Sequence, residues 1–183
     1  DSSDSLEVLQ LRPNFYLIAG AGANIAVQTG DLGAVVVDTG SGKASARVIE
    51  EIKKLTSKPI RYIIDTSADP DHIGGNEALS AAGQSLIPLN TAGGGRGGVG
   101  NLVSNGGAAA ILATDNVMDR MSAPTGQKAP YPSAATPSDT FNNAEKDTFL
   151  NGEAIMVYSL PAAHTDGDAM AFGNSKYRII VLP

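Results

Sequence analysis

The chain contains no cysteine and no tryptophan, and it has only two histidines, His72 and His164. Without cysteine, disulfide bonds and metal sites built from thiolates are excluded. Any chemistry that needs an imidazole has to use one or both histidines. The lack of cysteine does not fix the compartment, because a cysteine-free chain is stable in either redox environment.

Charge is also scarce, since charged residues make up 17% of the 183 residues and the net charge is −6. An acidic chain without a lysine or arginine cluster argues against nucleic acid and against an anionic membrane surface as partners. No segment approaches the roughly 20 apolar residues of a membrane span, and no signal peptide is present. The polar start, residues 1–4, is typical of a mature N-terminus. A secreted or periplasmic location is therefore compatible with the sequence, which does not decide it.

The residues that are present suit one folded domain, since 42% of them are hydrophobic and the length fits a single core. Short apolar runs between turn residues predict strands at 6–11, 15–19, 24–28, 34–37, 60–64 and 85–89. Apolar residues at helical spacing predict helices at 45–55 and 75–82. A meander of strands followed by strand–helix–strand units favours an α/β sandwich with its helices outside.

The middle of the chain changes character. Residues 91–107 are too rich in glycine for a core element, so we expect a flexible loop there. Helical spacing returns over 108–121. Residues 123–139 are rich in Pro, Ala, Ser and Thr, which predicts a connection on the surface.

Two hairpins are predicted near the end of the chain. The first joins strands at 148–150 and 154–160 through Asn151-Gly152, a strong signal for a two-residue turn. The second joins strands at 169–172 and 178–182. We therefore interpret residues 1–183 as one α/β (α+β) domain.

The most informative stretch is 62–76, where an apolar strand runs into a turn carrying Asp69, Asp71 and His72. Carboxylates and an imidazole crowded on a loop at the end of a strand are the donors that a divalent cation needs. Plainer interpretations stay open. Asp69-Pro70-Asp71 is also an ordinary turn sequence, and Asp71 could cap a helix that starts near Gly75.

This stretch resembles the metal-binding loop of the metallo-β-lactamase superfamily, whose pattern is Thr-His-x-His-x-Asp-His-x-Gly-Gly-Asn. In the family the Asp–His pair binds one of two zinc ions, and the two preceding histidines bind the other. Ser67 and Asp69 stand in place of those two histidines. The matching residues are Thr66, Asp71, His72, Gly74, Gly75 and Asn76.

The resemblance implies an αββα sandwich, in which two mixed sheets pack face to face, helices lie outside and metals sit at one edge. Family members use a metal-bound water or hydroxide to hydrolyse esters, amides, thioesters or phosphoesters. Ser67 is a poor zinc ligand, whereas Asp69 is an acceptable one, because a carboxylate oxygen can replace an imidazole nitrogen. That change hardens the site and favours a harder metal than zinc.

His164 lies in Leu-Pro-Ala-Ala-His-Thr-Asp-Gly-Asp, which resembles the second metal motif of the family, Pro-x-x-His-Thr-x-Gly. The resemblance implies one site for zinc or another divalent metal, held by some subset of Asp69, Asp71, His72 and His164. Asp71 has a second possible role as the catalytic acceptor of a proton from the attacking water. A solvent-exposed histidine on a loop is the plainer interpretation of His164.

The residues expected to support the ligands are Asp38, Ser67, Thr165 and Asp166, with Asp168 beside them. Asp38 ends a strand as Val-Asp-Thr-Gly, and in the family this aspartate orients the ligand at the position that is Ser67 here. A simple turn carboxylate is the other interpretation of Asp38. A solvated polar turn is the other interpretation of Asp166 and Asp168.

The chain departs from the family in a second way, because it stops at Pro183, before the Gly-Asp that supplies a bridging ligand in many members. We therefore expect a degraded or mononuclear hydrolase that attacks an ester, amide or lactam-type bond in a small-molecule substrate. The alternative is a non-catalytic protein of the same fold that binds a ligand or partner. A second chain or a missing C-terminal segment is expected to complete the fold.

Overall fold

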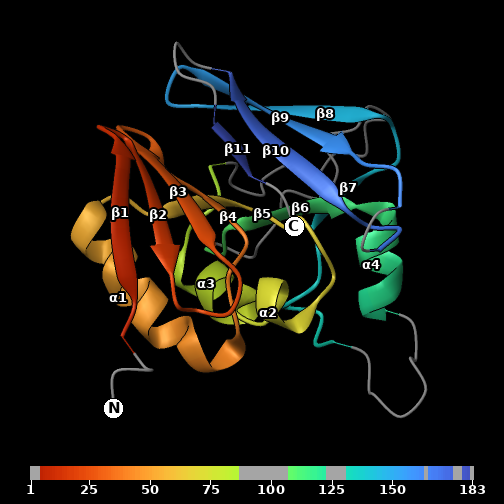
Figure 1. Ribbon diagram of the computed structural model, residues 1–183, viewed down its shortest axis with the longest axis horizontal. Helices are drawn as coiled ribbons and strands as arrows, with labels where there is room; N and C mark the ends of the chain where they lie inside the picture. The colour runs from red at the N-terminus through yellow and green to blue at the C-terminus, as the bar shows by residue number, and fades with distance from the viewer. Residues whose placement is uncertain (1–4, 87–106, 123–130, 163–164, 175–178, 182–183) are drawn as a thin grey trace.

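The computed structural model describes residues 5–86, 107–122, 131–162, 165–174 and 179–181. Within these residues two β-sheets pack face to face, and helices cover the outer side of the first sheet (Figure 1). The predicted sandwich of two sheets with outer helices is therefore confirmed. No helix in the described ranges is long and apolar enough to cross a membrane.

The first sheet is mixed, as expected. Its first four strands form an antiparallel meander, and each later strand runs parallel to the one before it. Strand pairs of this kind require a crossover, which helices supply after β4 and after β5. In spatial order the strands are β1 (Glu7–Arg12), β2 (Phe15–Ala19), β3 (Ile25–Gly30), β4 (Gly33–Val37), β5 (Ile60–Ile64), β6 (Ala110–Thr114) and β7 (Asp139–Phe141).

The helices follow the strands that they cover. α1 (Ser45–Leu55) has the bounds predicted from its apolar spacing, and it buries Val48 and Ile52. α2 (Pro70–Ile73) is a single turn within the motif, and α3 (Asn76–Ala82) follows it. α4 (Asp115–Ser122) comes directly after β6 and packs beside β6 and β7.

The central strands are buried on both faces, which explains their continuous apolar sequences. Val36 and Ile63 face α1 and α3 in one core, whereas Val35 and Ile64 face the second sheet in another. Alternation along each strand thus assigns neighbouring residues to two different cores. These two layers hold the ends of β4 and β5 in fixed positions.

The second sheet is antiparallel throughout the described residues, so the expectation of two mixed sheets holds only for the first. Its predicted hairpin at Asn151-Gly152 is confirmed, and both turn residues have positive φ, 56° and 77°. Only residues that tolerate this region suit such a turn. The strands are β8 (Glu145–Leu150), β9 (Glu153–Ser159), β10 (Ala169–Asn174) and β11 (Ile179–Val181), in the spatial order β11-β10-β9-β8.

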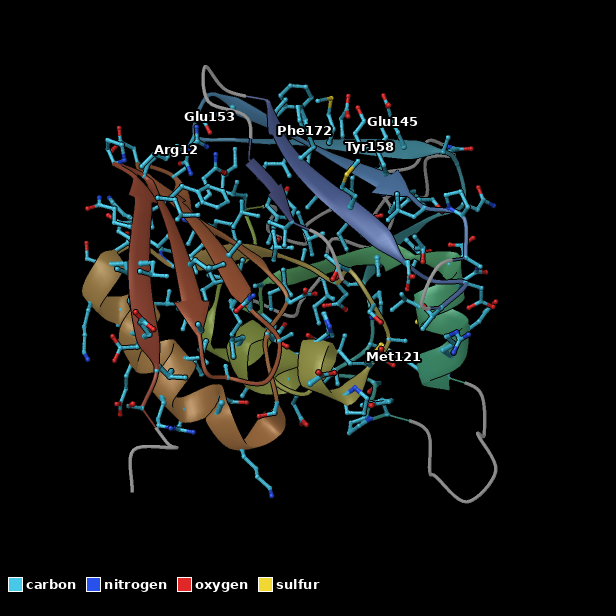
Figure 2. The ribbon with its side chains drawn as sticks, in the orientation of Figure 1. Arg12, Met121, Glu145, Glu153, Tyr158 and Phe172 are labelled. Carbon is cyan, nitrogen blue, oxygen red and sulfur yellow. The ribbon has the colours of Figure 1, made fainter. Side chains whose placement is uncertain are left out.

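The two sheets are also joined at one end by polar contacts. Arg12 Nη2 donates to Glu153 Oε2 at 3.1 Å, and both residues are labelled in Figure 2. The Gln28 amide donates to the same carboxylate. The core between the sheets is apolar. These polar contacts lie at its margin and link the two sheets there.

The prediction of one helix over 108–121 was wrong in its first half. Residues 110–114 form β6, which pairs with β5 and β7, and every side chain of this strand is buried on one or the other face of the sheet. A short apolar run does not distinguish a buried strand from a buried helix by periodicity alone. Only the second half of the segment, α4, is helical.

The predicted surface connection at 123–139 is confirmed for most of its described part, where residues 132–134 and 138 are exposed and no helix or strand begins before residue 139. Ala135 is buried against Val117 and Met121 of α4, and β7 begins at Asp139. Of the predicted strand at 85–89, the first two residues are not in a strand, and the other three lie outside the described residues. The glycine-rich segment 91–107 lies outside them too, except for its last residue.

Candidate functional site

The carboxyl ends of β4 and β5 lie side by side, because the two strands are parallel neighbours. Asp38 follows β4 and residues 65–67 follow β5, so these side chains meet at one edge of the sheet, where all are buried. The second sheet reaches the same edge, where Ala169 N donates to Thr66 O at 2.9 Å. Ligands of open α/β sheets bind at the carboxyl ends of the strands. This edge is therefore the candidate site.

Asp38 is the acceptor at the centre of the site. Its Oδ1 accepts from Thr66 N at 2.8 Å, and its Oδ2 accepts from Thr66 Oγ1 at 2.7 Å and from His72 Nδ1 at 2.9 Å. The backbone of Asp38 has a φ of 61°, in the left-handed region that few residues other than glycine adopt. Asp38 therefore orients His72, rather than the residue at position 67 as expected, and it is more than a turn carboxylate.

The imidazole of His72 is fixed in one orientation. Because a carboxylate can only accept, Nδ1 carries the hydrogen in this pair, and the lone pair of Nε2 is left for another partner. The hydrogen bond to Asp38 raises the pKa of His72, burial opposes this, and the charges of Asp71 and Asp69 add to it. Histidines that bind metals are held in this way by a carboxylate on the other ring nitrogen.

The raised pKa of His72 predicts a pH-dependent stability in the metal-free protein. The folded state holds the proton more tightly than the unfolded state, whose histidine pKa is about 6.5. This contribution is therefore complete below about pH 6.5 and is lost as the pH rises through the folded-state pKa. We expect the Tm of the metal-free protein to fall across this window, and His72→Asn to remove that part of the fall. Parallel profiles for the two proteins in thermal scans would contradict the assignment.

The two glycines of the motif let α2 and α3 pack closely against the turn after β4. A Cβ on Gly74 would lie 2.5 Å from Gly42 N, and one on Gly75 would lie 2.6 Å from Thr39 O. Thr39 also anchors the loop, because its N–H donates to the carbonyl of His72 at 2.7 Å. The two glycines thus allow the close packing that keeps the His72 imidazole next to Asp38.

Asp65 and Asn76 form a buried pair behind His72. Asn76 Nδ2 donates to Asp65 Oδ2 at 2.8 Å and to Ala135 O at 3.1 Å, while Asn76 Oδ1 accepts from Thr39 Oγ1 at 2.8 Å. Asp65 is fully buried, and its Oδ1 has no hydrogen-bond partner among the described residues. Burial raises the pKa of Asp65 well above its usual value, and the hydrogen bond from Asn76 opposes this. The sequence analysis did not predict Asp65 as a site residue, although it directly precedes Thr66 of the motif.

Asp65→Asn is expected to stabilise the protein at high pH. Because the folded state favours the protonated acid, the stability of the native protein falls as the pH rises above the unfolded-state pKa of about 3.9. An amide removes this cost and keeps an oxygen for Asn76. We expect a higher Tm for Asp65→Asn than for the wild-type protein at pH 8, and a difference that shrinks towards pH 4. Asp31→Asn, an exposed turn residue, is the control, and an equal Tm at all pH values would refute the prediction.

Ser67 and Asp69, which replace the first two histidines of the pattern, bind each other. Ser67 Oγ donates to Asp69 Oδ2 at 3.1 Å and accepts from Asp69 N at 3.3 Å. Asp69 is the N-cap of α2 but makes no side-chain cap hydrogen bond. Asp71 is exposed in the first turn of α2, and the N-cap of α3 is Gly75 without a side-chain cap, so Asp71 does not cap α3.

The loop after β9 brings a second group of predicted residues to the edge. Thr165 Oγ1 donates to Asp168 Oδ1 at 2.5 Å, and Asp168 is fully buried. The carboxylate of Asp166 instead points to α4, where it pairs with Arg120 Nε at 2.5 Å. Asp166 is thus placed on the surface with a cationic partner. His164 lies outside the described residues.

Tyr131 is a further residue that sequence reasoning missed. Tyr131 is partly buried against the core cluster around α4, and so is Ala68 of the motif loop. Burial raises the pKa of Tyr131, and the negative charge of Asp69 adds to this effect. The aromatic ring thus lies near the motif loop, although nothing in the local sequence of 131–139 indicates it.

Two comparisons with known proteins, one of the sequence and one of the structure, indicate the same family. Residues 18–89 match the sequence model of the metallo-beta-lactamase superfamily. A metallo-β-lactamase of Cronobacter sakazakii with an HARLDQ motif superposes with a TM-score of 0.73, at 17% identity, over 96% of this chain and 61% of its own. The resemblance to the metallo-β-lactamase superfamily is confirmed.

Other solved metallo-β-lactamases share the fold. BJP-1 of Bradyrhizobium japonicum, of subclass B3, has a TM-score of 0.68 at 17% identity and covers 96% of this chain and 61% of its own. A B3 enzyme described as having an active-site glutamic acid has a TM-score of 0.69 at 18% identity, over 97% and 62%. None of the curated proteins matches the chain. The chain thus spans less than two thirds of the length of these metallo-β-lactamases.

Members of the metallo-β-lactamase superfamily generally bind zinc or another divalent metal. The question for this chain is which side chains at the sheet edge could hold one. Among the described residues, no group of three or more His, Asp or Glu side chains is arranged to hold a metal ion. His164 is not one of the described residues. His72 nevertheless has the fixed ring of a metal ligand, and the charges of Asp69 and Asp71 reach it. The donor chemistry around His72 therefore fits one hard or borderline divalent metal.

Proposed function

We propose that the protein is a metal-dependent hydrolase with a single metal site. The ligands would be His72 and His164, together with Asp69 or Asp71. The observation that carries the proposal is the hydrogen bond from His72 Nδ1 to Asp38, 2.9 Å long and almost fully buried on the carboxylate side. Such a bond fixes the ring and increases its basicity as a ligand.

A single metal is favoured over two by the contacts of Ser67 and Asp69. In the family these two positions bind the first metal, and here the two side chains bind each other. Asp69 could exchange Ser67 for a metal, because an aspartate oxygen is a suitable hard donor. The solved relative with an active-site glutamic acid supports a carboxylate in such a site.

The residues around the site have separate tasks in the proposed reaction. A bound divalent metal supplies Lewis acidity and lowers the pKa of water to about 7. Asp38 holds the imidazole of His72, and Thr66 donates two hydrogen bonds to Asp38 and so fixes it in turn. Asp71 is exposed beside His72, where its carboxylate can accept the proton that leaves the attacking water. The substrate is a small molecule with an ester, amide or lactam-type bond.

The test is a metal-loading assay with two chromogenic substrates, a nitrophenyl ester and a cephalosporin. Purified protein is stripped with a chelator and then loaded with zinc, manganese or iron. We expect hydrolysis of at least one substrate that appears on loading and disappears on stripping. The variant His72→Ala is the matched inactive protein. Equal rates for stripped, loaded and inactive protein would refute the proposed activity.

A second candidate is a non-catalytic protein of the same fold that binds a ligand or partner. The hydrogen bonds between Ser67 and Asp69 favour it, because they satisfy these two side chains without a metal. The same experiment separates the candidates. A protein that takes up no metal and hydrolyses neither substrate would support the binding module.

A further inference from the structure

A cavity of about 470 Å³ lies on the helix-covered side of the first sheet, between the C-terminal ends of α1 and α3. These two helices pack against each other on that side (Figure 1). The volume is within the range of small-molecule sites, about 300–1,000 Å³. Pro59 and Ile60 line the cavity, which places it at the amino end of β5. It is therefore separate from the candidate site, which lies at the carboxyl end of the same strand.

The floor and walls of this cavity are mainly apolar. Ile52 and Ile60 are buried, and Ile49 and Pro59 are half-buried beside them. Ala82, the last residue of α3, is exposed and lines the cavity from the other helix. The residues that α1 contributes are spaced three and four apart, so they lie on one face of that helix. Apolar walls with a few polar groups are typical of pockets that bind small molecules.

Two lysines that line the cavity make no ion pair with any described residue. Lys53 is in the last turn of α1, Lys58 is in the loop that follows, and both are exposed. The neighbouring Lys54, in contrast, donates to Glu51 Oε1 at 2.7 Å. Thr56 Oγ1 accepts from Lys58 N at 3.0 Å and fixes the turn of the chain between the two lysines. A cleft that is lined by charge of one sign attracts ligands of the opposite sign.

The charge around the cavity is positive although the chain as a whole is acidic. Residues 43–61 hold six of the 13 lysines and arginines and only two acidic residues, which gives this segment a net charge of +4 in a chain of −6. Arg61 Nη1 donates to Gln84 O at 3.0 Å, and Gln84 also lines the cavity. The surroundings therefore favour an anionic ligand. The six cationic residues are Lys43, Arg47, Lys53, Lys54, Lys58 and Arg61.

We propose that this cavity binds a free carboxylic acid with an unbranched alkyl chain, as its anion. The carboxylate lies between Lys53 and Lys58, and the alkyl chain lies along Ile52 and Ile60 between the two helices. An anionic membrane is disfavoured as the partner, because the apolar residues are recessed in a cavity and the two glutamates of α1 interrupt its positive charge. The proposal does not depend on a metal or on the proposed hydrolase.

The test measures binding of decanoate by isothermal titration calorimetry, with a chelator present so that the carboxylate cannot bind to a metal. Decanol has the same alkyl chain without the charge and is titrated in parallel. We expect decanoate to bind the wild-type protein about tenfold more tightly than decanol, and salt to reduce this difference. Octanoate, which buries two fewer CH₂ groups, is expected to bind about tenfold more weakly than decanoate.

The double variant Lys53→Gln/Lys58→Gln tests the carboxylate end of the ligand. We expect it to weaken decanoate binding about tenfold and to leave decanol binding unchanged. The matched control is Lys43→Gln/Lys54→Gln. It removes the same charge from the same segment, at exposed positions that do not line the cavity.

Ala82→Phe tests the cavity itself, because the added ring takes the space of the alkyl chain. We expect it to eliminate binding of both decanoate and decanol. Ala81→Phe is the matched control, since Ala81 is exposed on α3 but does not line the cavity. Circular dichroism confirms that each variant is folded. His72→Ala is expected to bind decanoate as the wild-type protein does, which separates this cavity from the candidate site.

Four outcomes would overturn the proposal. The first is no binding of decanoate, or equal affinity for decanoate and decanol. The second is a lysine double variant or an Ala82→Phe variant that binds as its control does. The third is loss of decanoate binding in His72→Ala, which would assign the ligand to the candidate site. The fourth is co-sedimentation with phosphatidylglycerol vesicles that Lys53→Gln/Lys58→Gln reduces and Ala82→Phe does not, which would assign the lysines to a membrane surface.

Discussion

His72→Ala is expected to eliminate metal binding and hydrolysis together. The imidazole is the one described side chain whose ring is fixed for a ligand role, since Asp38 holds its other nitrogen. Loss of a supporting contact already costs about 10–100-fold in metal affinity, so loss of the ligand itself should cost more. His164→Ala is expected to have the same double effect, and Asp71→Ala is expected to eliminate hydrolysis whether Asp71 binds the metal or accepts the proton. The measurement is a metal titration followed by an activity assay.

A matched control is Glu77→Ala, which removes an exposed carboxylate from the first turn of the next helix. This variant should bind metal as the wild-type protein does. Full metal binding and full activity in His72→Ala would refute the site. Loss of activity with normal metal binding would instead show that His72 acts on the substrate and not on a metal.

Asp38→Asn is expected to weaken metal binding by about 10–100-fold while the protein stays folded. The carboxylate accepts from two donors of Thr66 and from His72, and an amide has only one oxygen to accept them. A buried donor left without a partner costs about 1–3 kcal/mol, so the Tm should also fall. Asparagine tolerates the left-handed backbone of this position, with a φ of 61°. The change therefore isolates the side chain.

Asp38→Ala separates the two contributions, because it removes the side-chain acceptor and also places alanine at a left-handed φ. We expect a larger fall in Tm for alanine than for asparagine in thermal unfolding of the metal-free proteins. Metal affinity is measured by competition with a chelating dye. An affinity of Asp38→Asn equal to that of the wild-type protein would show that Asp38 does not position a metal ligand.

Much of the fold followed from local patterns. The strands at 15–19 and 60–64 and the helix at 45–55 have the bounds that apolar spacing predicts. The turn at Asn151-Gly152 was also correct, because few other dipeptides adopt two successive positive φ angles. The order of residues in the motif predicted that the loop after β5 carries the candidate site.

The rest depended on contacts between distant segments. Residues 110–114 form a strand because they pair with β5 and β7 and are buried on both faces of the sheet, which the run Ala-Ile-Leu-Ala-Thr does not reveal. Asp38 is 34 positions from His72, and only the parallel pairing of β4 and β5 brings them together. Asp65 becomes notable only because it is buried with one oxygen that has no hydrogen-bond partner among the described residues. Such features arise from packing, so no local pattern predicts them.

The central claim, that His72 belongs to one metal site, is tested most directly by the metal content of the purified protein. Elemental analysis is made before and after soaking in zinc, manganese and iron, for the wild-type protein and for His72→Ala and His164→Ala. We expect about one metal per wild-type chain and none in either variant. No metal in the wild-type protein under any condition, or an equal content in the variants, would contradict it.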